Sequence, residues 1–134
     1  TSPESQWPNP TEINFDNQLQ LIGYEIIPRA LAPGETFTLT TFWQVPAPLP
    51  TPPHIFAQVL DSEWHVWGSH DGGHPAWTTG IVTDTRQITL IPDTPPGSYP
   101  VNVGLTSEAG RLKILGPKDR PVGDFISLGP IGVR

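Results

Sequence analysis

The sequence contains no cysteine and no methionine among its 134 residues. The absence of cysteine excludes a disulfide framework, a zinc site built from thiolates and a thiol nucleophile. No run approaches the roughly 18 apolar residues that a membrane span needs, and the first residues do not form a secretory signal pattern. Because the chain starts at Thr1 and has no methionine, we expect it to be a fragment of a longer protein.

Basic residues are also scarce. Seven Lys and Arg stand against 13 Asp and Glu, which gives a formal net charge of -6. This balance argues against a nucleic-acid partner and against attraction to an anionic membrane surface. We therefore expect no nucleic-acid binding and no direct insertion into a membrane.

Proline and glycine, by contrast, are abundant, with 18 and 13 copies. The longest stretch free of both is 54–67, so a long helix has almost no room. Leu, Ile, Val and Phe make up about a quarter of the chain, more than is typical of a disordered sequence. The composition therefore predicts a compact domain made of short extended segments.

The chain divides into a polar, proline-rich segment at 1–12, which we interpret as a linker or extended arm, and one domain at 13–134. Short apolar segments separated by turn residues predict an all-β fold, a two-sheet antiparallel β-sandwich of immunoglobulin-like or jelly-roll type with about eight strands. We expect strands near 19–27, 36–45, 55–60, 65–70, 81–90, 99–105, 111–115 and 125–132.

Alternation within these segments predicts which side chains point inward. In 36–45 the inward set is Phe37, Leu39, Trp43 and Val45, and in 99–105 it is Tyr99, Val101, Val103 and Leu105. Asp84 and Arg86 share a face with apolar residues, so they either pair across that face or mark a bulge. Pro100 cannot donate a main-chain hydrogen bond, which predicts an edge strand or a position where the missing N–H faces solvent.

Three histidines and a carboxylate lie within residues 65–74: His65, His70, Asp71 and His74. Imidazole and carboxylate are ordinary metal ligands. However, His65 and His70 point to opposite faces of a strand, and polar residues around Gly72 and Gly73 also suit a solvated hairpin end. We therefore expect no metal site, and keep His70, Asp71 and His74 as candidates for ligand binding.

Catalytic motifs are absent from the sequence. It has no nucleophile elbow, no HExxH, no phosphate loop and no dinucleotide fingerprint. Ser69, His70 and Asp71 are triad residue types, but neighbours on a strand alternate faces and cannot form the relay. The sequence therefore predicts a domain that is not an enzyme and needs no cofactor.

Five tryptophans are the more informative feature, because indole faces stack on the rings of bound sugars in β-sandwiches. Trp43 belongs to the predicted core. Trp64 follows the Asp61-Ser62-Glu63 turn and is expected to be exposed, whereas Trp77 lies in a long connection that it could pin down. Trp64 and Trp77 are the candidate ligand-binding aromatics, and the alternative is that these rings fill core gaps and cover loops.

An ordered series of motifs resembles a β-sandwich domain found in the extracytoplasmic part of membrane glycosyltransferases of the mannosyltransferase type, in green non-sulfur bacteria and cyanobacteria. It begins with Leu21-Ile22-Gly23-Tyr24 and with Ala32-Pro33-Gly34-Glu35-Thr36 running into Leu39-Thr40-Thr41-Phe42-Trp43. It continues through Phe56-Ala57-Gln58-Val59-Leu60-Asp61, His70-Asp71-Gly72, Trp77, Gly80-Ile81-Val82, Asp84, Leu90-Ile91-Pro92-Asp93, Pro95-Pro96-Gly97-Ser98-Tyr99, Val103-Gly104-Leu105 and Leu128-Gly129-Pro130-Ile131. The series covers nearly the whole chain from about Phe15.

The resemblance implies a sandwich outside the cytoplasmic membrane whose partner is the membrane-embedded portion of its parent protein or a glycan. It supplies no catalytic residue. Members of that family carry a glycine in the hairpin after the Leu-Asp pair, whereas this chain has Trp64 after Asp61-Ser62-Glu63. If Trp64 holds that glycine's backbone position, it adopts a left-handed conformation that is costly for a bulky residue.

The leading hypothesis is therefore a non-catalytic accessory module of a membrane glycosyltransferase, which contacts glycan or the partner domain. The alternative is a free-standing β-sandwich protein that binds carbohydrate or metal.

Overall fold

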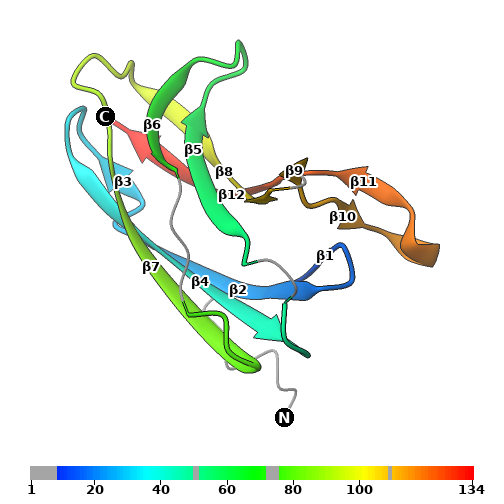
Figure 1. Cartoon of the computed structure of the whole chain (residues 1–134). Coiled ribbons are helices and arrows are strands. Elements are labelled where there is room, and N and C mark those ends of the chain that lie inside the picture. Colours follow the sequence, from blue (N-terminus) through cyan, green and yellow to red (C-terminus); the bar gives the residue numbers. More distant parts are fainter. Residues whose placement is uncertain (1–8, 50–51, 72–75, 109) are drawn as a thin grey trace.

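The structure is a computed structural model, and it describes residues 9–49, 52–71, 76–108 and 110–134 (Figure 1). Almost all regular structure in this part of the chain is β. The strands are β1 (Pro10–Phe15), β2 (Leu19–Ile27), β3 (Ala30–Leu31), β4 (Thr36–Val45), β5 (His54–Leu60), β6 (Val66–Asp71), β7 (Gly80–Thr89), β8 (Gly97–Ser107), β9 (Gly110–Arg111), β10 (Ile114–Leu115), β11 (Pro121–Gly123) and β12 (Ile126–Val133). A short 3-10 helix, η2 (Pro117–Asp119), lies between β10 and β11.

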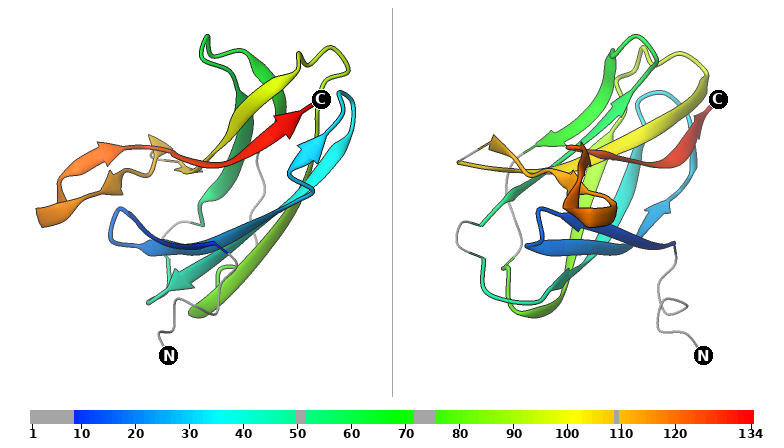
Figure 2. Two further views of the ribbon diagram at one scale, coloured as in Figure 1. Left: turned by 180° about the vertical axis from the view of Figure 1, so that it is seen from behind. Right: turned by 90° about the vertical axis from the view of Figure 1, so that its right-hand side faces the viewer.

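The strands form two sheets that pack face to face, which confirms the predicted all-β sandwich (Figures 1 and 2). Sheet A has the order β11-β10-β1-β2-β4-β7, and sheet B has the order β3-β12-β8-β5-β6, with β9 paired to β8. The predicted count of about eight strands is too low. The described strands number twelve, because β1, β3 and β11 add to the predicted set and segment 111–115 is divided between β9 and β10.

The first strand includes the last residues of the segment interpreted as a linker or extended arm. Residues 10–12 form the start of β1, which pairs with β2. Alternation explains this, because Thr11, Ile13 and Phe15 turn toward the protein while Pro10 and Glu12 are exposed. Residues 1–8 of that segment lie outside the described residues.

The strand order is that of an immunoglobulin-like sandwich, one of the two predicted types. β2, β4 and β7 hold the positions of strands A, B and E, and β12, β8, β5 and β6 hold those of G, F, C and C′. Near the start of β8, the Tyr99 hydroxyl donates a hydrogen bond of 2.6 Å to the Pro95 carbonyl. A tyrosine at this corner, bonded to the backbone a few residues upstream, is a hallmark of immunoglobulin-like sandwiches.

The expectation of purely antiparallel sheets needs one correction. β3 and β12 pair in parallel, with Gly132 opposite Ala30 and Val133 opposite Leu31. Parallel pairing is possible here because the two strands are distant in sequence and no tight hairpin joins them.

The core lies between the sheets and follows the predicted alternation. Phe37, Leu39, Trp43 and Val45 of β4 are all buried, as are Tyr99, Val101, Val103 and Leu105 of β8. Trp43 is fully buried and packs on Phe15, with 5.5 Å between ring centroids. In β4 and β8 the apolar residues that alternate in the sequence are therefore the ones buried in the core.

Pro100 does not mark an edge strand, because β8 lies between β12 and β5. The pairing of β8 with β12 shifts register between Leu128 and Ile131, which are opposite Val101 and Tyr99. Pro100 therefore lies opposite an irregular part of the hydrogen-bond ladder. Its lack of an N–H costs no regular hydrogen bond there.

The dipeptide Leu112-Lys113 forms main-chain hydrogen bonds to both sheets. The Leu112 N–H donates to the Leu105 carbonyl of β8 at 2.9 Å, and the Lys113 carbonyl accepts from the Asp16 N–H at 2.8 Å, beside β1. The chain thus leaves sheet B at β9 and enters sheet A at β10 (Figure 2). Among the described residues, no helix has the length and apolar character that crossing a bilayer requires.

The Tyr99 corner gives a testable prediction. Replacing Tyr99 by Phe removes the hydroxyl and leaves the Pro95 carbonyl without this donor, so we expect the free energy of unfolding to fall by about 1–2 kcal/mol. Urea unfolding followed by circular dichroism measures this change. Tyr24→Phe is the matched control, because the Tyr24 hydroxyl makes a longer contact of 3.4 Å with the Gly129 N–H. Equal losses in the two variants would contradict the assignment.

Candidate functional site

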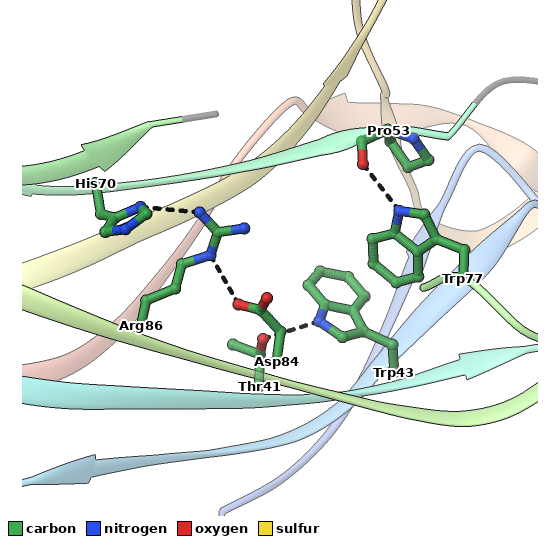
Figure 3. Close-up of polar contacts among 7 residues, drawn as sticks. All are labelled: Thr41, Trp43, Pro53, His70, Trp77, Asp84 and Arg86. Atoms are coloured by element: carbon green, nitrogen blue, oxygen red, sulfur yellow. Dashed lines mark hydrogen bonds and ion pairs between the residues drawn. The ribbon is translucent and has the colours of Figure 1, made fainter. Parts of the chain in front are cut away.

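Trp77 packs into the interior of the sandwich. Its indole N–H donates to the Pro53 carbonyl at 2.9 Å, and its ring meets Trp43 edge-on with 5.8 Å between centroids (Figure 3). These contacts match the interpretation that Trp77 pins its connection to the core. Trp77 adjoins the start of β5 and Trp64 follows the end of β5, so the structure does not bring the two candidate tryptophans together.

His70 takes part in a chain of polar contacts at the edge of the sandwich (Figure 3). Its Nδ1 lies 2.9 Å from Nη1 of Arg86. A guanidinium only donates, so Nδ1 accepts and the ring carries its hydrogen on Nε2. Arg86 is 6% exposed, and its Nε lies 2.7 Å from Oδ2 of Asp84. Of the two alternatives for Asp84 and Arg86, pairing is therefore the one found, and it partners a buried charge.

The other two candidates in this segment cannot be placed. Asp71 ends β6 with its backbone opposite Phe56, but its side chain lies outside the described residues, as does all of His74. Among the residues that the structure does describe, no group of three or more His, Asp or Glu side chains is placed to hold a metal ion.

Trp64 has the left-handed backbone conformation that the resemblance to the glycosyltransferase-associated sandwich predicts for it. Its φ is +64°, in the left-handed region, and its side chain is 68% exposed. The ring meets Phe125 edge-on with 6.2 Å between centroids. Of the described tryptophans, Trp64 is the one whose indole N–H has no hydrogen-bond partner among the described residues.

The carboxylate of Asp61 holds the turn that presents Trp64. Its Oδ1 accepts hydrogen bonds from the main-chain N–H groups of Glu63 at 2.8 Å and His65 at 2.9 Å, and its Oδ2 accepts from the indole of Trp67 at 3.0 Å. The bond from the His65 main chain is the largest cause that lowers the pKa of Asp61 below its usual value of 3.8. The left-handed residue is thus fixed by bonds that favour the ionised carboxylate.

The outer face of sheet B carries a row of polar side chains. Register pairs align Ser127 of β12, Asn102 of β8, Gln58 of β5 and Ser69 of β6 in one line across four strands. The Ser127 hydroxyl donates to Oδ1 of Asn102 at 2.7 Å. Amide and hydroxyl groups in such a row both donate and accept hydrogen bonds.

The aromatic ring of Phe56 lies beside the polar row, on the same face of sheet B. Phe56 pairs with Gly104, and a Cβ at Gly104 would come within 2.3 Å of the Phe56 ring. The absence of a side chain there lets the ring lie against the sheet. The Arg111 guanidinium carbon lies 4.5 Å from the Phe56 ring centroid, and Nη1 of Arg111 lies 3.6 Å from a carboxylate oxygen of Asp124. Arg111 is therefore held by a cation–π contact and an ion pair.

These groups enclose a hollow of about 130 Å³, which we name the outer pocket. Its lining is Phe56, Gln58, Leu60, Trp64, Asn102, Arg111 and Phe125. Trp64 is the one predicted site residue in this lining. The other six were missed because they come from β5, β8, β9 and the residue directly before β12, and only the register of sheet B brings them together. The one available signal was the near-continuous apolar run 55–60, which indicates a strand covered on both faces.

Comparison with known proteins adds no assignment: no protein-family model matches the chain, and no curated protein matches it with significance. The resemblance to the glycosyltransferase-associated sandwich therefore stands on the motifs quoted above.

The left-handed backbone at Trp64 gives a testable prediction, and the opposite result is expected at a control position. Both Trp64→Ala and Trp64→Gly remove the ring, but only glycine relieves the left-handed conformation, so the glycine variant should be the more stable by about 1 kcal/mol. At Val122, which is exposed in β11 without a positive φ, the order should reverse, with alanine more stable by about 0.5–1 kcal/mol. Urea unfolding of the four variants tests this. Alanine being the more stable at both positions would contradict the geometry of the turn.

The turn also predicts a pH dependence. A lowered pKa in the folded state means that the Asp61 carboxylate contributes stability that is present above about pH 4 and is lost as the pH falls through the folded-state pKa. Asp61→Asn should therefore be less stable than the wild type at pH 7, and the gap should close as the pH is lowered below 3.8. Unfolding at a series of pH values measures it, with Asp93→Asn at an exposed turn as the control. A gap that stays constant with pH would argue against this role.

Proposed function

We propose that this chain is a non-catalytic module that contacts glycan through the outer pocket, as an extracytoplasmic accessory part of a membrane glycosyltransferase. The observation that carries the proposal is Trp64, whose exposed indole borders a pocket rimmed by amides. A sugar ring has an apolar face that stacks on an indole and hydroxyl groups that bond to amides. Trp64 and the pair Gln58 and Asn102 offer both kinds of surface at one place.

The conformation of Trp64 supports a use for its ring. A left-handed non-glycine residue costs about 1–3 kcal/mol, and such strain gathers at binding sites. Asp61 accepts two main-chain hydrogen bonds that hold the turn in place. An exposed indole whose N–H has no partner among the described residues, held in this way, is pre-organised for a ligand, which lowers the entropy lost on binding.

The lining of the outer pocket supports a binding role rather than catalysis. None of the described residues that line it is a carboxylate, a histidine or a hydroxyl nucleophile. Its one charged group, Arg111, is paired with Asp124. Acid–base and nucleophilic mechanisms require groups of another kind at such a position.

The motif series from 21 to 131 supports the association with a membrane glycosyltransferase and the extracytoplasmic location. A free-standing carbohydrate-binding protein is the alternative that shares the same pocket. The parent reading frame separates the two, because adjoining hydrophobic spans are expected only for the accessory module.

Calorimetric titration with a panel of glycans tests the proposal. We expect at least one sugar to bind, and Trp64→Ala to bind it at least tenfold more weakly. Val122→Ala is the matched control, because Val122 is 64% exposed and is not part of the pocket lining.

Circular dichroism of both variants serves to check that they are folded. Two results would overturn the proposal: no heat of binding at millimolar concentrations of any sugar in the panel, or equal affinity in wild type and Trp64→Ala.

A further inference from the structure

A second hollow adjoins the outer pocket. It has a volume of about 460 Å³ and is lined by Asp61, Ser62, Gly97, Ser98, Tyr99 and Pro100. We name it the end hollow, because it lies between the β5–β6 turn and the start of β8. Its position relative to the outer pocket is fixed by the pairing of β5 with β8.

The register makes the two hollows neighbours. Gln58 pairs with Asn102 and Val59 pairs with Val101, so Leu60 comes next opposite Pro100. The outer pocket reaches Leu60 and Asn102, and the end hollow begins at the next positions along each strand. The lining residues of the two hollows are therefore only one position apart on the β5 side, at Leu60 and Asp61, and two positions apart on β8, at Asn102 and Pro100.

The outward side of β8 runs through both hollows. Tyr99 and Val101 point into the core, so Ser98, Pro100 and Asn102 point outward. The four residue-to-residue steps from Ser98 to Asn102 span about 13 Å along the strand. That length exceeds what one sugar ring at Trp64 would cover.

Size gives a second argument. Pockets that bury most of a small ligand have volumes of about 300–1,000 Å³. The outer pocket, at about 130 Å³, is below this range, whereas the end hollow, at about 460 Å³, is within it. A ligand that occupied the outer pocket alone would leave most of its surface in water.

The charges indicate a neutral ligand. Arg111 in the outer pocket is paired with Asp124, and Asp61 in the end hollow already accepts three hydrogen bonds, two from its own turn and one from Trp67 of β6. The remaining polar groups are amides and hydroxyls, among them Gln58 and Ser98. The net charge of -6 further disfavours an acidic glycan.

We propose that the outer pocket and the end hollow form one groove for a neutral oligosaccharide of at least two sugar units, with one unit on Trp64 and the next along Ser98 and Pro100. This rests on the proposed function and adds the length and charge of the ligand. A single sugar fills only one part of the groove, so affinity should rise with chain length until both hollows are occupied.

The test is calorimetry with neutral manno-, cello- and galacto-oligosaccharides of one to four units and with oligogalacturonates of the same lengths. We expect the tetrasaccharide of at least one neutral series to bind at least tenfold more tightly than its monosaccharide. We also expect the oligogalacturonates to bind more weakly than that series at every length.

Two variants locate the effect. Ser98→Tyr places a bulky ring in the end hollow and should weaken tetrasaccharide binding about tenfold. Thr83→Tyr is the matched control, because Thr83 is exposed on β7, on the outer face of sheet A, and should keep the wild-type affinity.

Equal affinity for the mono- and tetrasaccharide, unchanged tetrasaccharide binding by Ser98→Tyr, or oligogalacturonates binding as tightly as the neutral sugars would overturn this inference while the proposed function stands. If no sugar of any length binds, the proposed function itself fails.

Discussion

The register between β5 and β8 is the constraint on which both the interior and the outer face of sheet B depend. It places Ile55, Ala57 and Val59 between the sheets and turns Phe56 and Gln58 outward. Because side chains alternate, a slip of one residue would bring the polar row into the core and expose the apolar set. Packing of the core therefore also fixes the positions of the groups that line the outer pocket.

The sequence and the structure agree most closely where one face of a strand is buried. The bounds predicted for 19–27 and 36–45 are those of β2 and β4, because buried and more exposed positions alternate along the whole of β4 and along β2 as far as its register shift near Gly23. Strands of two or three residues, such as β3 and β11, are too short to show a period. The left-handed Trp64 could be anticipated from a missing glycine, but the outer pocket could not, since its residues meet only through pairings between distant segments.

The tryptophans show why residue type alone did not separate structural from candidate binding side chains. The indole N–H groups of three tryptophans each donate to a group of the protein: Trp43 to Thr41, Trp67 to Asp61 and Trp77 to Pro53. Such a partner is expected for a buried ring that fills space in the fold. Trp64 differs in having an exposed ring on a turn that is held by other residues. The distinction lies in how each ring's polar edge is satisfied, and that depends on tertiary structure.

The Leu112–Lys113 bridge between the sheets has a consequence for dynamics. One main-chain bond of this dipeptide is made to Leu105 of sheet B and the other to Asp16 beside sheet A, so the sheets cannot separate at this end without breaking at least one of the two. Opening of this end should therefore expose the amide proton of Leu112 or that of Asp16 to exchange with solvent, although the two belong to different sheets. Arg111 directly precedes the bridge, so the same event would release its guanidinium from Phe56, and local opening of the sandwich would be felt at the outer pocket.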